Sequence, residues 1–162
     1  MKTKAVRLYG KNDIRTEEFE LPEMKDDEIL AKVICDSICM SSHKAALQGA
    51  DHKRVPNNVA ENPIILGHEF CGEILDVGSK WAGEFKPGDR FSIQPALNYK
   101  GTLAAPGYSY RNIGGGATYV IIPNEVTERR KKEFTHFLSR GEAYLQSEAL
   151  KIQAERRKNY FL

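Results

Sequence analysis

The sequence predicts a mainly β fold, a barrel or sandwich of short strands with short helices, followed by a helical C-terminal tail. The first observation behind this is a series of short runs rich in β-branched residues, separated by turn residues, all before residue 124. The second is a break in composition at Thr127, since all seven prolines and twelve of the thirteen glycines precede it. The third is that the residues after Thr127 are rich in good helix formers. We therefore expect one domain at 1–126 and a basic helical tail at 127–162.

The strand-like runs lie between recognisable turns. Gly-Lys-Asn-Asp at 10–13 suits a turn between the first two runs. Lys-Pro-Gly-Asp at 86–89 suits another, because proline presets one dihedral angle and glycine accepts a positive φ. The sequence therefore predicts strands at 4–10, 13–21, 28–38, 71–78, 90–95 and 117–123.

Three segments have the composition of helices. Residues 41–50, SSHKAALQGA, fit a short helix, with a serine available as the N-cap and Gly49 near the end. Segments 127–138 and 141–162 lack proline, and the apolar residues of the second do not form one wide stripe. A tail of this kind is expected to pack on a surface or to depend on a partner.

Composition narrows the class of protein. A hydrophobic content of 41% and a charged content of 28% allow a packed core. No apolar run reaches the roughly 18 residues of a membrane span, and the N-terminus has no apolar signal-peptide core. Three cysteines without a repeating spacing argue against a disulfide framework and for a reducing compartment. We expect a cytoplasmic protein that has no membrane partner.

Charge is distributed unevenly along the chain. The net charge is only +2, but residues 127–162 carry nine Lys or Arg against five Glu. The basic runs at 128–132 and 155–158 suit a solvated helical face better than a phosphate-binding one, since no aromatic pairs interleave them. Nucleic acid is therefore not expected as a partner.

Three residues are candidates for a metal site. Cys39 follows a predicted strand, whereas His68 and Glu69 lie in a turn before another strand. Thiolate and neutral imidazole are favoured zinc ligands, and a carboxylate can serve as a third. Two strand ends so far apart in sequence can meet at one rim of a barrel. From these residues alone, however, a buried cysteine and a structural histidine are the simpler interpretation.

Longer motifs favour the metal-site interpretation of these residues. Residues 62–95, NPIILGHEFCGEILDVGSKWAGEFKPGDRFSIQP, resemble the core of the zinc-dependent medium-chain dehydrogenases, which combines Gly-His-Glu with a spaced Val-Gly and Gly-Asp-Arg. Residues 36–49 are similar to the upstream element of that family, and 114–125 to the strand that ends its N-terminal catalytic domain. The resemblance covers 1–126 and is closest to sorbitol- and sorbose-1-phosphate-type reductases. It implies a GroES-like, partly open β-barrel.

The resemblance also implies roles for four residues. Cys39 and His68 match the first two ligands of the catalytic zinc, and Glu69 matches the acid that supports the metal or exchanges onto it. Ser41 falls where the family places the hydroxyl that passes on the substrate proton. Zinc would polarise an alcohol or carbonyl oxygen while hydride moves to or from a nicotinamide. Without the resemblance, Ser41 can equally be read as a helix N-cap.

The sequence departs from the family pattern in two places. No cysteine follows Cys71, so the four-cysteine structural zinc of many relatives is not expected. The three glycines at 114–116 precede a strand, and so fail the test for a phosphate loop; they suit a close approach to another strand. The 36 residues after Val126 leave no room for a Rossmann domain. NAD(P) binding is therefore expected of full-length relatives, and no cofactor-binding residue is assigned in this chain.

Other candidate residues receive structural interpretations. Cys35 and Cys71 are expected in the core, and His43, His52 and His136 on the surface. The loop at 50–63 suits a position near a substrate mouth, although charges of this kind are more often simply solvated. Apolar surface that would face a missing domain favours a homo-oligomer.

Two functions remain open at this point. The first is the catalytic-domain portion of a zinc-dependent, NAD(P)-linked dehydrogenase for an alcohol, polyol or sugar phosphate, inactive alone because the nucleotide-binding domain is missing. The alternative is a non-catalytic GroES-like interaction module whose helical tail binds a partner.

Overall fold

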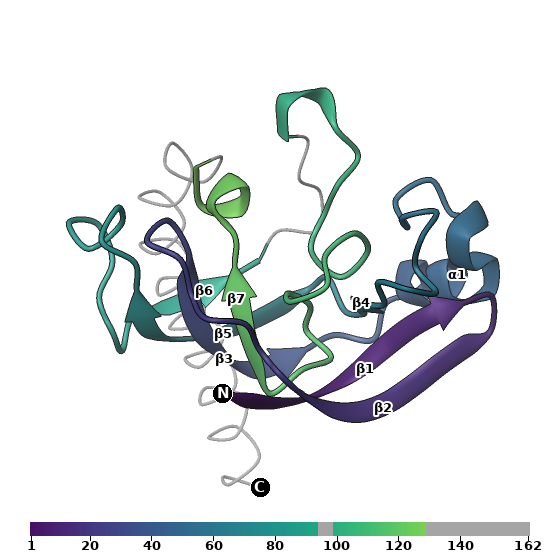
Figure 1. Cartoon of the computed structure of the whole chain (residues 1–162), viewed down its shortest axis with the longest axis horizontal. Helices are drawn as coiled ribbons and strands as arrows, with labels where there is room; N and C mark the ends of the chain where they lie inside the picture. The colour runs from purple at the N-terminus through teal and green to yellow at the C-terminus, as the bar shows by residue number, and fades with distance from the viewer. Residues whose placement is uncertain (94–98, 129–162) are drawn as a thin grey trace, which may run out of the picture. The chain divides into compact units, whose positions relative to one another are not determined.

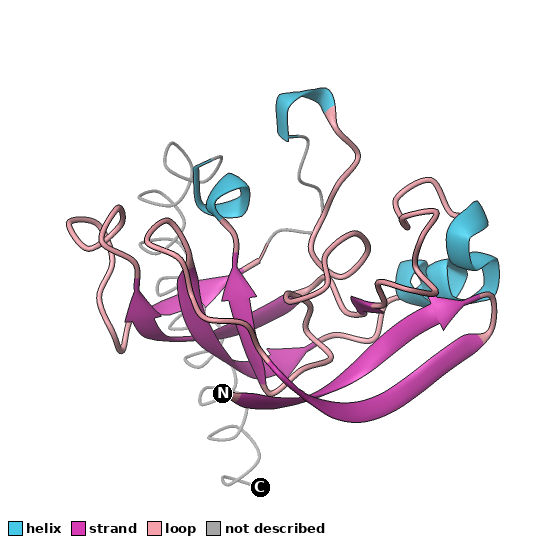
Figure 2. Cartoon of the chain, viewed as in Figure 1, coloured by secondary structure: helices cyan, strands magenta, loops and turns pink. Residues whose placement is uncertain are grey.

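The computed structural model describes residues 1–93 and 99–128, and Met1–Arg129 form one compact unit. Within the described part, the chain is built mainly from strands with short helical segments between them, as Figures 1 and 2 show. The predicted helical tail at 127–162 lies almost wholly outside the described residues.

The first sheet contains three antiparallel strands in the order β2-β1-β4. Strands β1 (Lys2–Gly10) and β2 (Asp13–Glu20) form a hairpin, and β4 (Ile64–Ile65) pairs with the other edge of β1. The turn between β1 and β2 is the predicted one, and Asn12 adopts a φ of 58° in it. Alternate residues of β1 are buried, which is expected of a strand with one face on the core.

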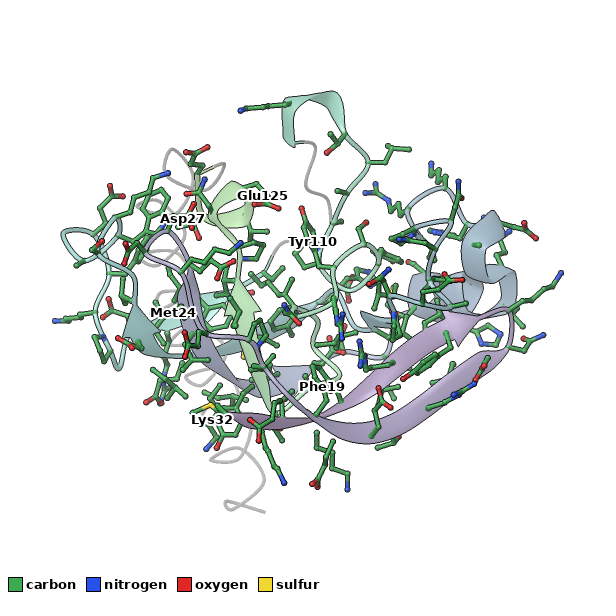
Figure 3. All side chains as sticks on the ribbon, in the orientation of Figure 1. Phe19, Met24, Asp27, Lys32, Tyr110 and Glu125 are labelled. Carbon is green, nitrogen blue, oxygen red and sulfur yellow. The ribbon has the colours of Figure 1, made fainter. Side chains whose placement is uncertain are left out.

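The second sheet contains four antiparallel strands in the order β6-β5-β3-β7. They are β3 (Ile29–Asp36), β5 (Phe70–Val77), β6 (Arg90–Ser92) and β7 (Tyr119–Ile122). The register of β3 on β5 pairs Lys32 with Glu73, and Lys32 is labelled in Figure 3 near the lower edge of this sheet.

A short segment joins the two sheets. Ala5 of β1 makes an isolated bridge to Ala117. Thr118 donates its amide to the Lys4 carbonyl at 3.0 Å and accepts the Val33 amide on its own carbonyl at 3.0 Å. One residue thus hydrogen-bonds to both sheets, while the sheets do not close into a continuous barrel. The predicted partly open, mainly β barrel is confirmed.

The helical elements follow strand ends. Helix α1 (Met40–Gln48) runs directly into a 3₁₀ turn, η1 (Gly49–Asp51). A second 3₁₀ turn is η2 (Tyr99–Gly101), and residues 124–128 form a last helical turn. The expected serine cap is wrong, because Cys39 is the N-cap of α1 and makes no side-chain capping hydrogen bond. Gly49 ends the helix as predicted, at a φ of 54°.

Backbone segments pack closely around Gly67. The amide of Gly115 donates to the Gly67 carbonyl and the amide of Gly116 to the Leu66 carbonyl, each at 2.8 Å. Gly67 has a φ of 95°, and a Cβ there would meet the Asp36 carboxylate and the backbone of 115–116. The glycines at 114–116 therefore serve the close approach that the sequence predicted, and they hold the turn that leads into β5.

Replacing Gly67 with alanine should destabilise the protein by about 2 to 4 kcal/mol. Alanine would have to adopt the positive φ of Gly67, and its Cβ would overlap the atoms that surround this position. Urea unfolding followed by circular dichroism measures this loss. Gly83→Ala is the matched control, since Gly83 is exposed, has no positive φ, and nothing lies within 4 Å of a Cβ built there. Equal unfolding midpoints for the two variants would contradict the constraint at Gly67.

Candidate metal centre

The structure brings Cys39, His68 and Glu69 together. Cys39 stands between the end of β3 and the start of α1, and the other two residues lie between β4 and β5. One ligand atom from each side chain lies within 4.8 Å of the other two. This is the convergence of two distant strand ends that the sequence predicts; the role of the three residues as metal ligands stays a prediction.

His68 is held on both sides of its ring. Its side chain is 4% exposed, its Nδ1 lies 3.1 Å from the Ser42 hydroxyl, and its Nε2 lies 3.2 Å from the Tyr108 hydroxyl. Burial lowers the pKa of His68, although the nearby Glu69 carboxylate opposes the shift. A neutral imidazole is the form that a metal ion requires.

Glu69 lies at the solvent side of the cluster. Its Oε1 is 3.8 Å from His68 Nε2, so His68 presents Nε2 to the carboxylate. Its other oxygen accepts a hydrogen bond from the Ser37 hydroxyl, and its backbone carbonyl accepts the Ser37 amide at 3.0 Å. Sequence reasoning missed Ser37, whose role follows only from the pairing of the two strand ends.

Cys39 and Ser41 form the remaining edge. The Sγ of Cys39 and the Oγ of Ser41 are 3.1 Å apart. Cys39 is partly exposed and Ser41 is exposed, so both are accessible from solvent. Ser41 therefore lies beside a candidate ligand, as the resemblance implies, and its role in proton transfer stays a prediction.

Tyr108 is the largest addition to the site that the sequence analysis did not predict. Its ring is buried, stacks on His52 with centroids 5.5 Å apart, and lies 4.7 Å from the ring of His68. Burial raises the pKa of Tyr108, with the Ser41 side chain opposing the shift. Its hydroxyl therefore remains protonated at neutral pH. The only signal in the sequence was an aromatic residue directly after Gly107.

The loop at 51–63 supports Tyr108 from behind. The Arg54 guanidinium lies 5.9 Å from the Tyr108 ring and donates to the Leu103 carbonyl at 2.8 Å. The Ser109 hydroxyl donates to the Arg54 carbonyl at 2.7 Å. The surface position expected for His52 is wrong, because His52 is buried under Tyr108. His43 is exposed as expected, and His136 lies outside the described residues.

The segment around Tyr108 reaches the first sheet through its backbone. The carbonyl of Tyr110, labelled in Figure 3, accepts the Ile65 amide of β4 at 3.2 Å. The backbone at Gly107 lies so close to Gly67 that a Cβ on Gly107 would overlap the Gly67 carbonyl. Hydrogen bonds and close packing therefore hold this loop against the turn that carries His68.

Two further cysteines differ from their expected core positions. Cys35 is exposed and Cys71 partly exposed, and their sulfur atoms are 2.9 Å apart across β3 and β5. Burial, followed by the hydrogen bond with Cys35, raises the pKa of the Cys71 thiol to about 11. The expectation failed because both residues lie on the open face of the strand pair.

Comparison with known proteins decides the family. A family model described as the alcohol dehydrogenase GroES-like domain matches residues 25–130. The chain belongs to this family. Similar sequences include an L-sorbose 1-phosphate reductase of Klebsiella pneumoniae, 61% identical over 124 residues, which cover 76% of this chain and 30% of the relative. A mannitol-1-phosphate 5-dehydrogenase of Aliivibrio fischeri is 49% identical over 121 residues, which cover 75% of this chain and 28% of the relative.

Solved structures agree with this assignment. The 2R,3R-butanediol dehydrogenase of Bacillus subtilis has a TM-score of 0.60 at 29% identity, covering 76% of this chain and 39% of that one. A structure from Sinorhizobium meliloti 1021, assigned as a zinc-binding dehydrogenase and bound to NADP, has a TM-score of 0.59 at 28% identity, covering 77% and 37%. The alcohol dehydrogenase GroES-like assignment and the fold class are thus confirmed.

The match covers only part of each curated relative. The chain spans about 30% of the length of the curated relatives that it matches. Among the described residues, no helix has both the length and the apolar character needed to cross a membrane.

The buried histidine behind Tyr108 should make stability depend on pH. Burial, followed by the charges of Lys44, Arg54 and Lys53, holds the pKa of His52 below its ordinary value of 6.5. Its contribution to stability is present above pH 6.5 and is lost as the pH falls through the lower folded-state pKa. In chelator-treated protein, the urea midpoint should therefore fall less between pH 7.5 and 5.0 in His52→Gln than in the wild type. The exposed control His43→Gln should fall as the wild type does, and an equal fall in all three proteins would contradict the prediction.

Proposed function

We propose that residues 1–126 are the catalytic domain of a zinc-dependent, NAD(P)-linked alcohol or polyol dehydrogenase, in which Cys39, His68 and Glu69 hold the zinc. The observation that carries the proposal is the separation of their ligand atoms, all within 4.8 Å. In a tetrahedral zinc site with bonds of about 2.0 to 2.3 Å, ligand atoms lie roughly 3.3 to 3.8 Å apart. Small side-chain adjustments therefore suffice to close the site around an ion.

The chemistry of the donors fits a catalytic rather than a purely structural zinc. One thiol, one neutral imidazole and one carboxylate supply three ligands, which leaves one position of a tetrahedron open. Ser42 occupies Nδ1 of His68, so Nε2, which lies 3.8 Å from Oε1 of Glu69, would be the ligand atom once the Tyr108 hydroxyl gives up its 3.2 Å contact with it. A hydrogen bond of this kind on the far nitrogen fixes the orientation of a ligating histidine.

The surrounding residues suit the transfer of a proton from a bound alcohol. Bound zinc would supply Lewis-acid polarisation of the substrate oxygen. The exposed hydroxyl of Ser41, 3.1 Å from Cys39 Sγ, can accept the substrate proton and pass it to solvent. Tyr108 remains a neutral hydrogen-bond donor at the buried side of the site, and its ring keeps water from His68. Hydride transfer would use a nicotinamide held by residues outside 1–126.

For the substrate, we propose a polyol or a sugar phosphate. Support comes from the names of the similar proteins, an L-sorbose 1-phosphate reductase and a mannitol-1-phosphate 5-dehydrogenase. The chain itself adds positive charge: Lys44, Lys53 and Arg54 all act electrostatically on His52 beside the site. A cluster of cations suits an anionic phosphate group better than a neutral sugar.

We also propose a domain boundary, a homo-oligomer and a cytoplasmic location. The domain boundary near Val126 is supported by the family match to residues 25–130. A homo-oligomer is supported by the exposed apolar side chains of Ile34, Ile38 and Met40. A cytoplasmic location is supported by thiols that a reducing compartment would preserve.

The chelator-stripped 162-residue chain should bind one Co²⁺ with a thiolate-to-cobalt charge-transfer band, and Zn²⁺ should displace it. Cys39→Ser should abolish the band and weaken Zn²⁺ binding at least about 100-fold, because it removes a first ligand. Ser42→Ala should keep the band but weaken binding about 10- to 100-fold, since the imidazole loses its orienting partner. Absorption spectroscopy with a competing chelator measures both.

The control for that experiment is His43→Gln, which changes an exposed imidazole outside the site. It should bind both metals as the wild type does. Unchanged metal binding in Cys39→Ser would refute the ligand assignment and would favour the alternative of a non-catalytic interaction module.

The 162-residue chain alone should bind Zn²⁺ but should show neither saturable NAD(P)H binding nor turnover of sugar phosphates. The reason is that hydride transfer requires a positioned nicotinamide, and the described residues contain no strand–glycine-rich turn–helix unit to hold one. Fluorescence titration of NADH and NADPH tests this directly. Saturable nucleotide binding by this chain would overturn the proposal that residues outside 1–126 hold the nicotinamide.

A further inference from the structure

Two thiols face each other across the second sheet, outside the candidate metal centre. Cys35 lies on β3 and Cys71 on β5, and the register pairs the two residues directly after an irregularity between Val33 and Cys35. Their Sγ atoms are 2.9 Å apart. Cys35 lies three residues along β3 from Lys32, which is labelled in Figure 3.

The backbone geometry of this pair is that of a bridgeable site. Residues opposite each other in an antiparallel pair have Cα atoms about 4.5 to 5.5 Å apart, and disulfides span Cα separations of about 4.4 to 6.8 Å. A bond of about 2.05 Å requires the two sulfur atoms to approach by roughly 0.9 Å. The two sulfur atoms are therefore already close to bonding distance.

The pair is also reachable from solvent. Cys35 is exposed and Cys71 is partly exposed, unlike the buried cysteines that behave as small apolar residues. Where disulfides form in a reducing compartment they are usually transient and redox-dependent. The expectation of a reducing compartment therefore does not argue against a reversible bond at this position.

The geometry points to a reversible disulfide between Cys35 and Cys71, formed by exchange with a low-molecular-weight disulfide. The Cys35 sulfur attacks one sulfur of the small disulfide and releases one small thiol, which leaves a mixed disulfide on Cys35. The Cys71 sulfur then attacks Cys35 Sγ and expels the second small thiol. The two protein thiols are oxidised, the small disulfide is reduced, and the two protons leave on the two small thiols.

The third cysteine is not part of this pair. Cys39 lies beyond the end of β3, with its sulfur 3.1 Å from Ser41 Oγ. Ser37 lies one residue beyond the end of β3 and Glu69 one residue before β5, so the Ser37–Glu69 pair follows the Cys35–Cys71 pair by two residues on the same face. The disulfide would link the two strands two residues from Glu69 while leaving the Cys39 thiol free. The inference does not depend on zinc binding.

The test uses the full 162-residue chain, reduced, stripped of metal and then incubated with one molar equivalent of oxidised glutathione, which is enough to oxidise one thiol pair. The intact mass should fall by about 2 Da, for two hydrogens lost. The number of free thiols should fall from the three that the sequence contains to one. Cleavage before Asp36 separates Cys35 from Cys39, so the linked peptides identify which of the two is joined to Cys71. Dithiothreitol should restore the original mass and all three thiols.

Matched serine variants separate the possible outcomes. Cys39→Ser should still lose two thiols, whereas Cys35→Ser and Cys71→Ser should instead keep a stable glutathione adduct. Circular dichroism confirms that each variant is folded. The oxidised wild type should unfold at a higher urea concentration than its reduced form, because a link across 36 residues constrains the unfolded chain. A disulfide that includes Cys39, or an oxidised wild type that retains only mixed glutathione adducts, would overturn the inference.

Discussion

Close backbone packing at Gly67 is the constraint on which the rest of the site depends. The carbonyls of Leu66 and Gly67 accept hydrogen bonds from the glycine amides at 115–116, and Gly107 approaches Gly67 from another direction. Three segments distant in sequence therefore meet at one residue without a side chain. Because His68 follows directly, its position relative to β3 is set by backbone contacts before any metal is considered.

That packing also sets the electrostatics of the site. The loop at 105–109 brings Tyr108 onto His68, and the loop at 51–63 brings His52 and Arg54 behind it. Burial of the two imidazoles favours their neutral forms, and burial of the phenol favours its protonated form. Glu69, the carboxylate of the cluster, stands at the exposed side. A cation would thus approach from solvent, toward the carboxylate and the accessible sulfur of Cys39.

Much of the fold was predictable because its signals are local. Turn residues mark the β1–β2 hairpin, and the hydrogen bond from the Asp89 amide to the Lys86 carbonyl closes the turn predicted there. The strand β4 was not predicted, because two residues are too short to show a period and depend on β1 as a partner. The same distinction applies to the site. Cys39, His68 and Glu69 lie in short motifs, whereas Ser37, His52 and Tyr108 join them only through strand pairing and loop packing. The prediction that Cys35 lies in the core was wrong for the same reason, because the exposure of a sheet face depends on what packs against it.

The pairing of β3 with β5 connects the candidate metal centre with the Cys35–Cys71 pair. An extended chain repeats its side-chain direction every two residues. Ser37, one residue beyond β3, therefore continues the face of Cys35, and Glu69, one residue before β5, continues the face of Cys71. Ser37 donates both its hydroxyl and its amide to Glu69, which extends the pairing of the two segments beyond the Asp36–Phe70 pair. Any covalent link at the thiol rung therefore acts on the strand end that orients the carboxylate. The pairing of β3 with β5 brings two remote motifs together in the candidate metal centre, and it also places the Cys35–Cys71 pair next to that centre. This arrangement does not require a contact between the Cys35–Cys71 pair and Cys39.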